Sequence, residues 1–196
     1  KMENPEREYL ARYRAGDADA LGELVELFRQ PLFGFILRMT GGQDDADDIF
    51  QEVWLRVIKN QSRYTQKNFK SWLYRIAQNL VIDRARKRKP IVDLQATATR
   101  KEENVFETRI EEKGLAPPDR IDAKTLGKRI VDAVRLLPED QRAVFLMRTE
   151  ADLPFREIAK IQGISINTAL ARMQYALAKL REALKSEYSE LQGLQS

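Results

Sequence analysis

The sequence predicts an all-α protein made of two helical modules joined by a flexible linker. Apolar residues recur at helical spacing through the first 90 residues and again from about Leu126, and no segment shows the alternation typical of a β-strand. Between Ile91 and Asp122 this periodicity is lost, and the stretch contains a Pro117-Pro118 pair. We therefore expect modules at 5–92 and 124–190, a linker at 93–123 and a tail at 191–196.

Four helices are expected in the first module. A short helix beginning at Pro5 ends at Gly16, and Asp17 is placed to cap the next one, which continues to Gly41. Helical spacing assigns this second helix an apolar face formed by Leu21, Leu24, Val25, Leu27 and Phe28. The third and fourth helices are expected at 44–60 and from Phe69 to just before Pro90.

The second module is expected to contain four more helices, near 124–136, 139–150, 155–161 and 166–187. Two of them form a pattern typical of a helix-turn-helix. Ala159 is small enough to let the helices approach, Gly163 supplies the turn, Ile164 fills the core and Ser165 can cap the second helix. In this motif the second helix enters the major groove of DNA. An ordinary helical hairpin with glycine in its loop is the alternative.

Composition excludes several kinds of chemistry. The chain contains neither Cys nor His, which excludes disulfides, thiolate nucleophiles, histidine bases and the usual transition-metal ligands. No apolar run approaches the roughly 20 residues that a membrane span needs, and no signal peptide is visible. We expect a cytoplasmic, non-enzymatic protein that needs no cofactor or metal and does not insert into a membrane.

The third helix begins with four carboxylates between Asp44 and Asp48. Carboxylates at this end favour the helix dipole, which is the simplest explanation. At 100° per residue, however, Leu55 falls in the middle of a polar ridge, whereas Ile49 and Val53 face the core. An exposed leucine flanked by acidic residues is also typical of a surface that docks another protein.

The fourth helix combines a core stripe with a second, polar face. Leu73, Ile76, Ala77 and Leu80 form the core stripe. Trp72, Arg75, Asn79 and Arg86 share another face, which offers a stacking ring, an amide and guanidinium groups suited to unstacked bases and phosphates. Five of the six residues at 84–89 are basic, which favours a polyanionic partner over a merely solvated helix end.

These elements resemble, in order, a bacterial sigma factor of the extracytoplasmic-function (ECF) class. The resemblance covers about residues 7–90 and 126–185. The motifs that carry it are DADDIFQEVWL at 45–55, WLYRIAQNL at 72–80, LPEDQRAVFL at 137–146 and the helix-turn-helix at 155–169. It implies a sigma region 2 bundle followed by a sigma region 4 helix-turn-helix, and a transcription initiation factor that binds RNA polymerase core and promoter DNA.

The resemblance also implies residue roles. The acidic helix would dock on the β′ clamp helices of the polymerase through Asp47, Asp48, Gln51, Glu52 and Leu55. The −10 element would be melted and held by Tyr64, Trp72, Arg75, Asn79, Arg84, Arg86, Lys87 and Arg88. The second module would dock on the β flap and read the −35 element through Arg156, Ser165, Asn167, Thr168, Arg172 and Gln174. An anti-sigma factor is a further implied partner.

The sequence departs from the family pattern in its recognition helix. Residues 166–178 contain a single charge, Arg172, where the family usually carries several basic residues, and Asp152 stands where a glycine is common. Because phosphate neutralisation supplies most sequence-independent affinity, we expect weak −35 binding by the isolated second module. Alternatively, Arg156, Lys160 and Lys179 suffice for affinity, or the apolar residues of this helix contact a protein partner.

Three other functions remain open at this stage. A helix-turn-helix regulator acting without polymerase would explain the second module but not the acidic ridge or the Trp72 face. A Mg²⁺-dependent nuclease would need carboxylates that converge from different elements, whereas 44–48 lie on one helix end. An adaptor would use the same modules only to hold proteins together.

Overall fold

The structure, a computed structural model, describes residues 5–61, 64, 68–88 and 123–185. This part of the chain folds into eight helices and contains no strand. The helices are α1 (Pro5–Arg14), α2 (Asp19–Thr40), α3 (Gln43–Asn60), α4 (Phe69–Arg88), α5 (Ala123–Leu136), α6 (Glu139–Thr149), α7 (Phe155–Gln162) and α8 (Ile166–Ala183). The all-α prediction is confirmed. The linker and tail expected at 93–123 and 191–196 lie outside the described residues except for Ala123, so the module boundaries remain predictions.

The first module is a bundle in which α2, α3 and α4 pack on one another and α1 covers α2. Apolar residues at helical spacing form its core: Leu24, Phe28, Leu32 and Phe35 of α2, Ile49, Val53 and Val57 of α3, and Leu73, Tyr74 and Ala77 of α4. Gly41 ends α2 in the left-handed region, with φ of 76°, and its N–H donates to the carbonyl of Leu37. The chain therefore reverses tightly into α3.

The second module contains α5 to α8, with α6 and α7 packed on α8. Val144, Leu146, Met147 and Ile158 are fully or almost fully buried at its centre. The turn between α7 and α8 has the geometry that the sequence predicts. Gly163 lies in the left-handed region with φ of 68°, and Ser165 Oγ accepts a 3.0 Å hydrogen bond from the Thr168 amide.

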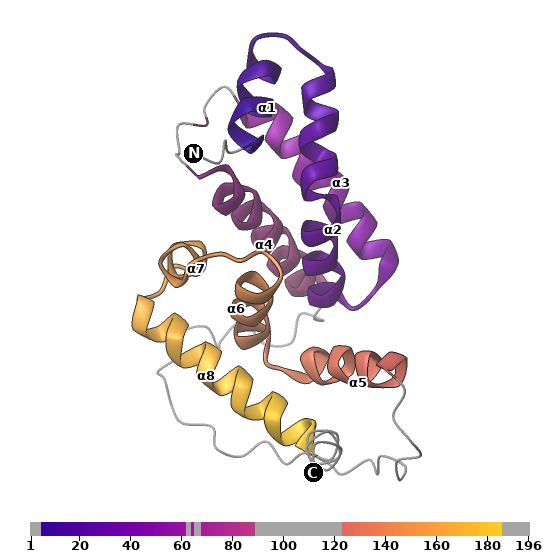
Figure 1. Cartoon of the computed structure of the whole chain (residues 1–196), viewed down its shortest axis with the longest axis vertical. Helices are drawn as coiled ribbons and strands as arrows, with labels where there is room; N and C mark the ends of the chain where they lie inside the picture. Colours follow the sequence, from indigo (N-terminus) through magenta and orange to yellow (C-terminus); the bar gives the residue numbers. More distant parts are fainter. Residues whose placement is uncertain (1–4, 62–63, 65–67, 89–122, 186–196) are drawn as a thin grey trace.

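The two modules pack directly on each other, an arrangement that the sequence does not predict. Figure 1 shows α1–α4 in the upper part of the molecule and α5–α8 below, with α6 and α7 lying between α4 and α8. The junction forms where α4 meets α7 and where α2 meets α5 and α6. Arg135 Nη2 donates to the Gly41 carbonyl at 3.0 Å, and Arg142 Nη1 donates to the Arg38 carbonyl at 3.4 Å. Burial lowers the pKa of the Arg142 guanidinium.

Three local expectations need correction. Leu27, expected on the apolar face of α2, is 42% exposed, because it lies at the edge of the buried stripe, about 100° around the helix from Phe28. The residue that precedes α2 is Ala18, although Asp17 does accept a hydrogen bond from the Asp19 amide. Ile164, expected to fill the core, is only half-buried.

Candidate functional surfaces

The outer face of α3 forms the ridge that the sequence predicts. Asp47, Asp48, Gln51 and Leu55 are exposed, and the Glu52 side chain is partly exposed beside Arg56, with which it forms a 2.9 Å ion pair. The inward face buries Ile49, Val53 and Val57, which fixes the orientation of the helix. The Leu55 side chain is 60% exposed. It lies at a shallow surface hollow lined by Glu52, Leu55, Arg56, Lys59 and Asn60.

Ion pairs connect the acidic start of α3 to the basic end of α4. Arg84 spans Asp45 and Asp48, with nitrogen–oxygen distances of 3.2 and 3.3 Å, and Arg88 pairs with Asp45. Asp45 is buried, so it holds the end of α4 in place. Of the four basic residues predicted to hold phosphates, Arg84 and Arg88 thus contact carboxylates in this structure, whereas Arg86 and Lys87 are exposed.

Aromatic rings gather at the start of α4. Trp72 stacks on Tyr64, with ring centroids 4.7 Å apart and planes 28° from parallel, and Phe69 packs edge-on against both. Arg14 lies over the Tyr64 ring and donates to the carbonyls of Gln61 and Tyr64. Burial raises the pKa of the Tyr64 hydroxyl to about 12.

Tyr64 is predicted to contact DNA, and in this structure it is only 8% exposed. Trp72, by contrast, is only partly buried. The position of Tyr64 is that of a support beneath the Trp72 ring.

Arg75 and Asn79, which share a face of α4, differ in exposure. Asn79 is exposed. Arg75 is partly buried, and its Nε atom is enclosed without a hydrogen-bond partner among the described residues. Sequence reasoning missed the buried residues Ser71, Tyr74 and Gln78 on a neighbouring face of α4. Their spacing of three and four residues places them on one face of the helix. Because Ser71 and Gln78 are polar, that face is not recognisable as a buried stripe from the sequence.

The second module presents the exposed start of α8. Asn167 and Gln174 are exposed, Thr168 is half-buried against the Ser165 cap, and Arg156 of α7 is exposed. Arg172, which is also predicted to contact DNA, forms contacts within the module in this structure. Its Nη2 lies 3.0 Å from Asp140 Oδ2, and its Nη1 donates to Gln162 Oε1 at 2.8 Å.

The backbone conformation of Asp152, in the turn before α7, is one that glycine adopts more readily than other residues. Its φ is 47°, which makes it the only non-glycine residue with a positive φ in the described part of the chain. This region is unfavourable for residues with a Cβ, although aspartate is among those that tolerate it. Arg148 forms an ion pair with the Asp152 carboxylate.

Two features of the described residues bear on the other functions. Within the described ranges, no cluster of three or more Asp or Glu side chains is arranged to hold a metal ion, including at the start of α3. No helix in those ranges combines the length and apolarity required to cross a membrane.

Two family models match the chain in the order of its modules. Residues 24–91 match sigma-70 region 2, and residues 127–180 match sigma-70 region 4. The ECF RNA polymerase sigma factor SigW of Bacillus subtilis is 30% identical over 185 residues, which cover 94% of this chain and 99% of SigW. The RNA polymerase sigma factor CarQ of Myxococcus xanthus is 30% identical over 176 residues, covering 89% of this chain and 95% of CarQ.

Two solved structures share the fold. CnrH, solved in complex with the cytosolic domain of CnrY, superposes with a TM-score of 0.66 at 20% identity, covering 93% of this chain and 99% of CnrH. RpoE of Bartonella quintana, solved with the anti-sigma factor NepR, gives a TM-score of 0.63 at 21% identity, covering 84% of this chain and 96% of RpoE.

Proposed function

This chain belongs to the ECF family of bacterial RNA polymerase sigma factors and directs RNA polymerase to promoters. We propose that it does so through three surfaces and that it catalyses no chemical step of its own. The α3 ridge binds the polymerase core, the Trp72 face of α4 captures the −10 element, and the second module reads the −35 element. The observation that carries this assignment is the exposed Leu55, which is flanked by Gln51 and Glu52 on an otherwise polar ridge.

The α3 ridge is suited to a partner helix. Its exposed carboxylates, Asp47 and Asp48, provide charge that steers a basic partner, and Leu55 provides an apolar anchor that loses water on contact. The hollow beside Leu55 leaves room for a partner side chain. We assign the β′ clamp helices to this surface, as the family resemblance implies.

The Trp72 face is suited to bases that have left the duplex. Unstacking a base costs a few kcal/mol, which stacking on an aromatic ring and hydrogen bonds to an amide can offset. Tyr64 and Phe69 fix the Trp72 ring, and the exposed Asn79 lies two turns further along α4. Arg75 joins this surface, and Arg84, Arg86, Lys87 and Arg88 contact backbone phosphates. For Arg84 and Arg88 this requires exchanging Asp45 and Asp48 for phosphate.

The second module contributes the upstream contacts. The start of α8, capped by Ser165, enters the major groove, where Asn167, Thr168 and Gln174 reach base edges. Arg156 contacts phosphate, and Arg172 holds α8 to Asp140. The module docks on the β flap of the polymerase. An anti-sigma factor completes the set of partners, supported by the complex of RpoE with the anti-sigma factor NepR.

Binding to core polymerase tests the assignment of the α3 ridge. Leu55→Ala in the full chain should raise the dissociation constant for bacterial core polymerase about tenfold, since truncating a central apolar anchor commonly costs 1–2 kcal/mol. Leu27→Ala, which truncates a 42% exposed leucine on α2, is the control and should leave the constant within about twofold. Equal binding by Leu55→Ala and wild type would contradict the proposal.

If the chain were instead a polymerase-independent regulator, different DNA binding would be expected. It would bind promoter duplex specifically without core polymerase, and Leu55→Ala would leave that binding unchanged. The proposed function predicts start-site selection only when core polymerase is present. Comparing promoter binding with and without core polymerase therefore separates the two.

A further inference from the structure

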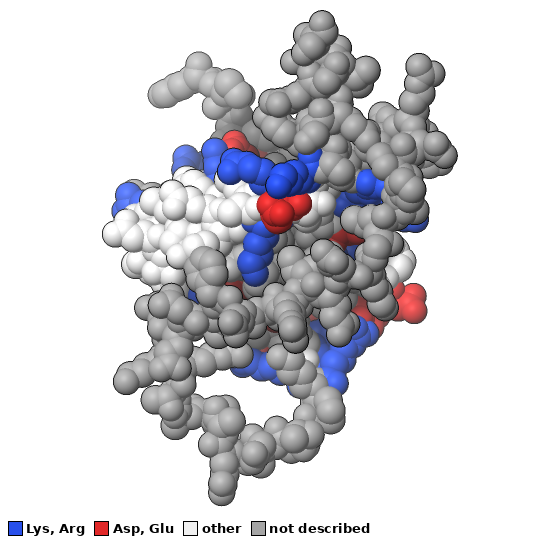
Figure 2. Space-filling model, turned by 90° about the horizontal axis from the view of Figure 1, so that it is seen from below, with Lys and Arg blue, Asp and Glu red and all other residues white. Residues whose placement is uncertain are grey.

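The outward face of α8 is uncharged. Between Ile166 and Ala178 the exposed residues are Ile166, Asn167, Leu170, Gln174, Tyr175, Leu177 and Ala178. Figure 2, which views the molecule from below, shows an uncharged area on the side where α8 begins, with Lys and Arg side chains at its margin. Ala169, Ala176 and Leu180 are buried and fix which side of the helix faces out.

Arg172, the single cationic residue between Ile166 and Ala178, already has polar partners within the module. The Arg172 guanidinium spans Asp140 of α6 and Gln162 of α7, at 3.0 and 2.8 Å, and its side chain is only 24% exposed. Moving it to DNA would break an ion pair and a hydrogen bond that hold α8 to its neighbours. Arg172 is therefore a positioning residue for α8 in this structure.

This arrangement limits which bases α8 can recognise. In the major groove, guanine is read mainly by Arg or Lys, adenine by the amides of Asn or Gln, and the thymine methyl by apolar side chains. Asn167, Leu170, Ala171 and Gln174 are spaced by three and four residues, so they share one face. That face offers two amides and an apolar surface, and it lacks a free guanidinium or ammonium group.

We propose that α8 recognises A·T base pairs in the upstream promoter element, with Asn167 and Gln174 contacting adenine and Leu170 contacting a thymine methyl group. The inference rests on the proposed function, because it presupposes that the second module reads DNA in the promoter. Cations outside this face, such as Arg156 and Lys179, contact phosphates and carry no base information. Specificity and affinity are thus assigned to different side chains.

Replacing thymine by uracil tests the methyl contact, since it removes the C5-methyl group and keeps base pairing. The template is the promoter used most strongly when the full chain and core polymerase transcribe fragmented genomic DNA. Its upstream block is made with uracil, and a matched template carries uracil only in the spacer. Transcription should fall about fourfold for each contacted methyl with the first template and stay unchanged with the second.

Leu170→Ala identifies the side chain that makes the contact. In this variant the penalty for upstream uracil should shrink to less than about twofold. Leu136→Ala, an 82% exposed leucine on α5 of the same module, is the matched control and should retain the full penalty. Because Leu170 is itself exposed, Leu170→Ala should fold normally, which unfolding curves check.

Several outcomes would overturn the inference. If transcription requires the upstream block but does not change when its thymines are replaced by uracil, α8 does not contact thymine methyl groups. If transcription falls when the guanines of the block are replaced by 7-deazaguanine, the second module recognises guanine instead. Wild-type transcription by Leu170→Ala on every template would show that Leu170 makes no contact that promoter recognition needs. The absence of any required upstream block would refute the −35 role of the second module as well, which distinguishes failure of the proposed function from failure of the inference alone.

Discussion

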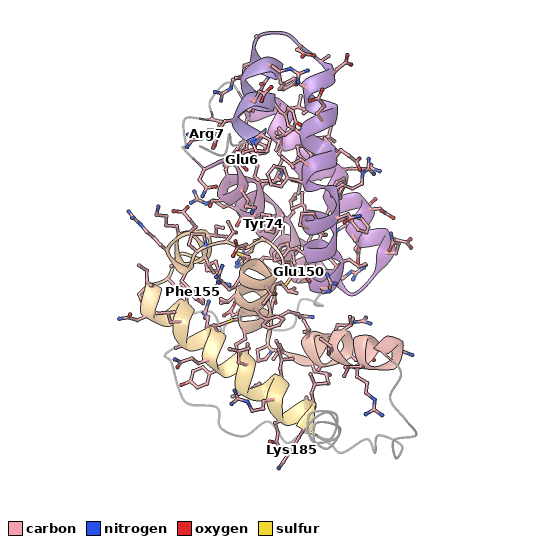
Figure 3. The ribbon with its side chains drawn as sticks, in the orientation of Figure 1. Glu6, Arg7, Tyr74, Glu150, Phe155 and Lys185 are labelled. Atoms are coloured by element: carbon pink, nitrogen blue, oxygen red, sulfur yellow. The ribbon has the colours of Figure 1, made fainter. Side chains whose placement is uncertain are left out.

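Arg38 of α2 and Glu150, which follows α6, form a 2.7 Å ion pair that joins the two modules. Figure 3 shows Glu150 beside the buried Tyr74 at the junction. Burial raises the pKa of the Glu150 carboxyl, and Arg38 opposes that rise. The pair lies close to Gly34 of α2: a Cβ there would be 2.9 Å from Arg38 Nη1 and 3.2 Å from Glu150 Oε2, so these flexible side-chain ends would have to shift.

Arg38→Ala is expected to destabilise the protein in a pH-dependent way. The carboxyl of Glu150 binds its proton more tightly in the folded than in the unfolded state, so its ionisation opposes folding. This penalty is absent below the unfolded pKa near 4.5 and grows as the pH rises through the folded pKa. Removing Arg38 increases the penalty, so the free energy of unfolding should fall by about 1 kcal/mol at pH 7 and by less at pH 4.

Urea unfolding at both pH values measures this effect. Arg29→Ala, which removes an exposed arginine of the same helix, is the control and should change stability by less than about 0.5 kcal/mol at both. Adding Glu150→Gln to Arg38→Ala should abolish the extra pH dependence. An equal loss at pH 4 and pH 7 for Arg38→Ala would contradict this account of the junction.

The Asp152→Gly variant of the protein should be more stable than the Asp152→Ala variant. Both substitutions remove the exposed ion pair with Arg148, but only glycine relieves the positive φ of 47°. We expect Asp152→Gly to exceed Asp152→Ala by about 1 kcal/mol in free energy of unfolding. Gly163→Ala, at φ of 68°, should lose about as much. Equal stability of the two Asp152 variants would show that the turn relaxes at no cost.

The role of Tyr64 as a support for Trp72 predicts which of its atoms matter. Tyr64→Phe keeps the ring that stacks on Trp72 and should retain promoter melting, whereas Tyr64→Ala should lose most of it. Permanganate reactivity of thymines in the −10 region, measured with holoenzyme, reports melting directly. A strong defect in Tyr64→Phe with normal stability would indicate that the hydroxyl itself contacts DNA.

Asn79 offers a test of base capture that does not disturb folding. Because its side chain is exposed, Asn79→Ala should change the free energy of unfolding by less than about 0.5 kcal/mol. Transcription from the chain's own promoter should nevertheless fall about tenfold. Asp83→Ala, at another exposed position of α4, is the control. Unchanged transcription by Asn79→Ala would remove this residue from the −10 surface.

Local sequence signals predicted the helices well. Gly41, Gly163 and Ser165 mark helix ends through backbone conformation and capping, which depend on a few neighbouring residues. The orientation of α3 also followed from its own periodicity, with Val53 buried and Leu55 exposed. Such features need no knowledge of the rest of the chain.

Contacts between distant residues could not be predicted in the same way. The pairing of Arg172 with Asp140, the support of Trp72 by Tyr64 and the Arg38–Glu150 junction all depend on how helices pack. In this structure Arg172 holds α8 to α6, Tyr64 lies beneath the Trp72 ring, and Arg38 joins the two modules through Glu150.

The central claim is that this chain gives core RNA polymerase its promoter specificity. The most direct measurement is transcription of fragmented genomic DNA by bacterial core polymerase with and without the full chain, followed by sequencing of the RNA 5′ ends. We predict discrete new start sites that share two upstream blocks and depend on Leu55. The absence of new start sites, despite a folded protein and active core polymerase, would contradict the claim.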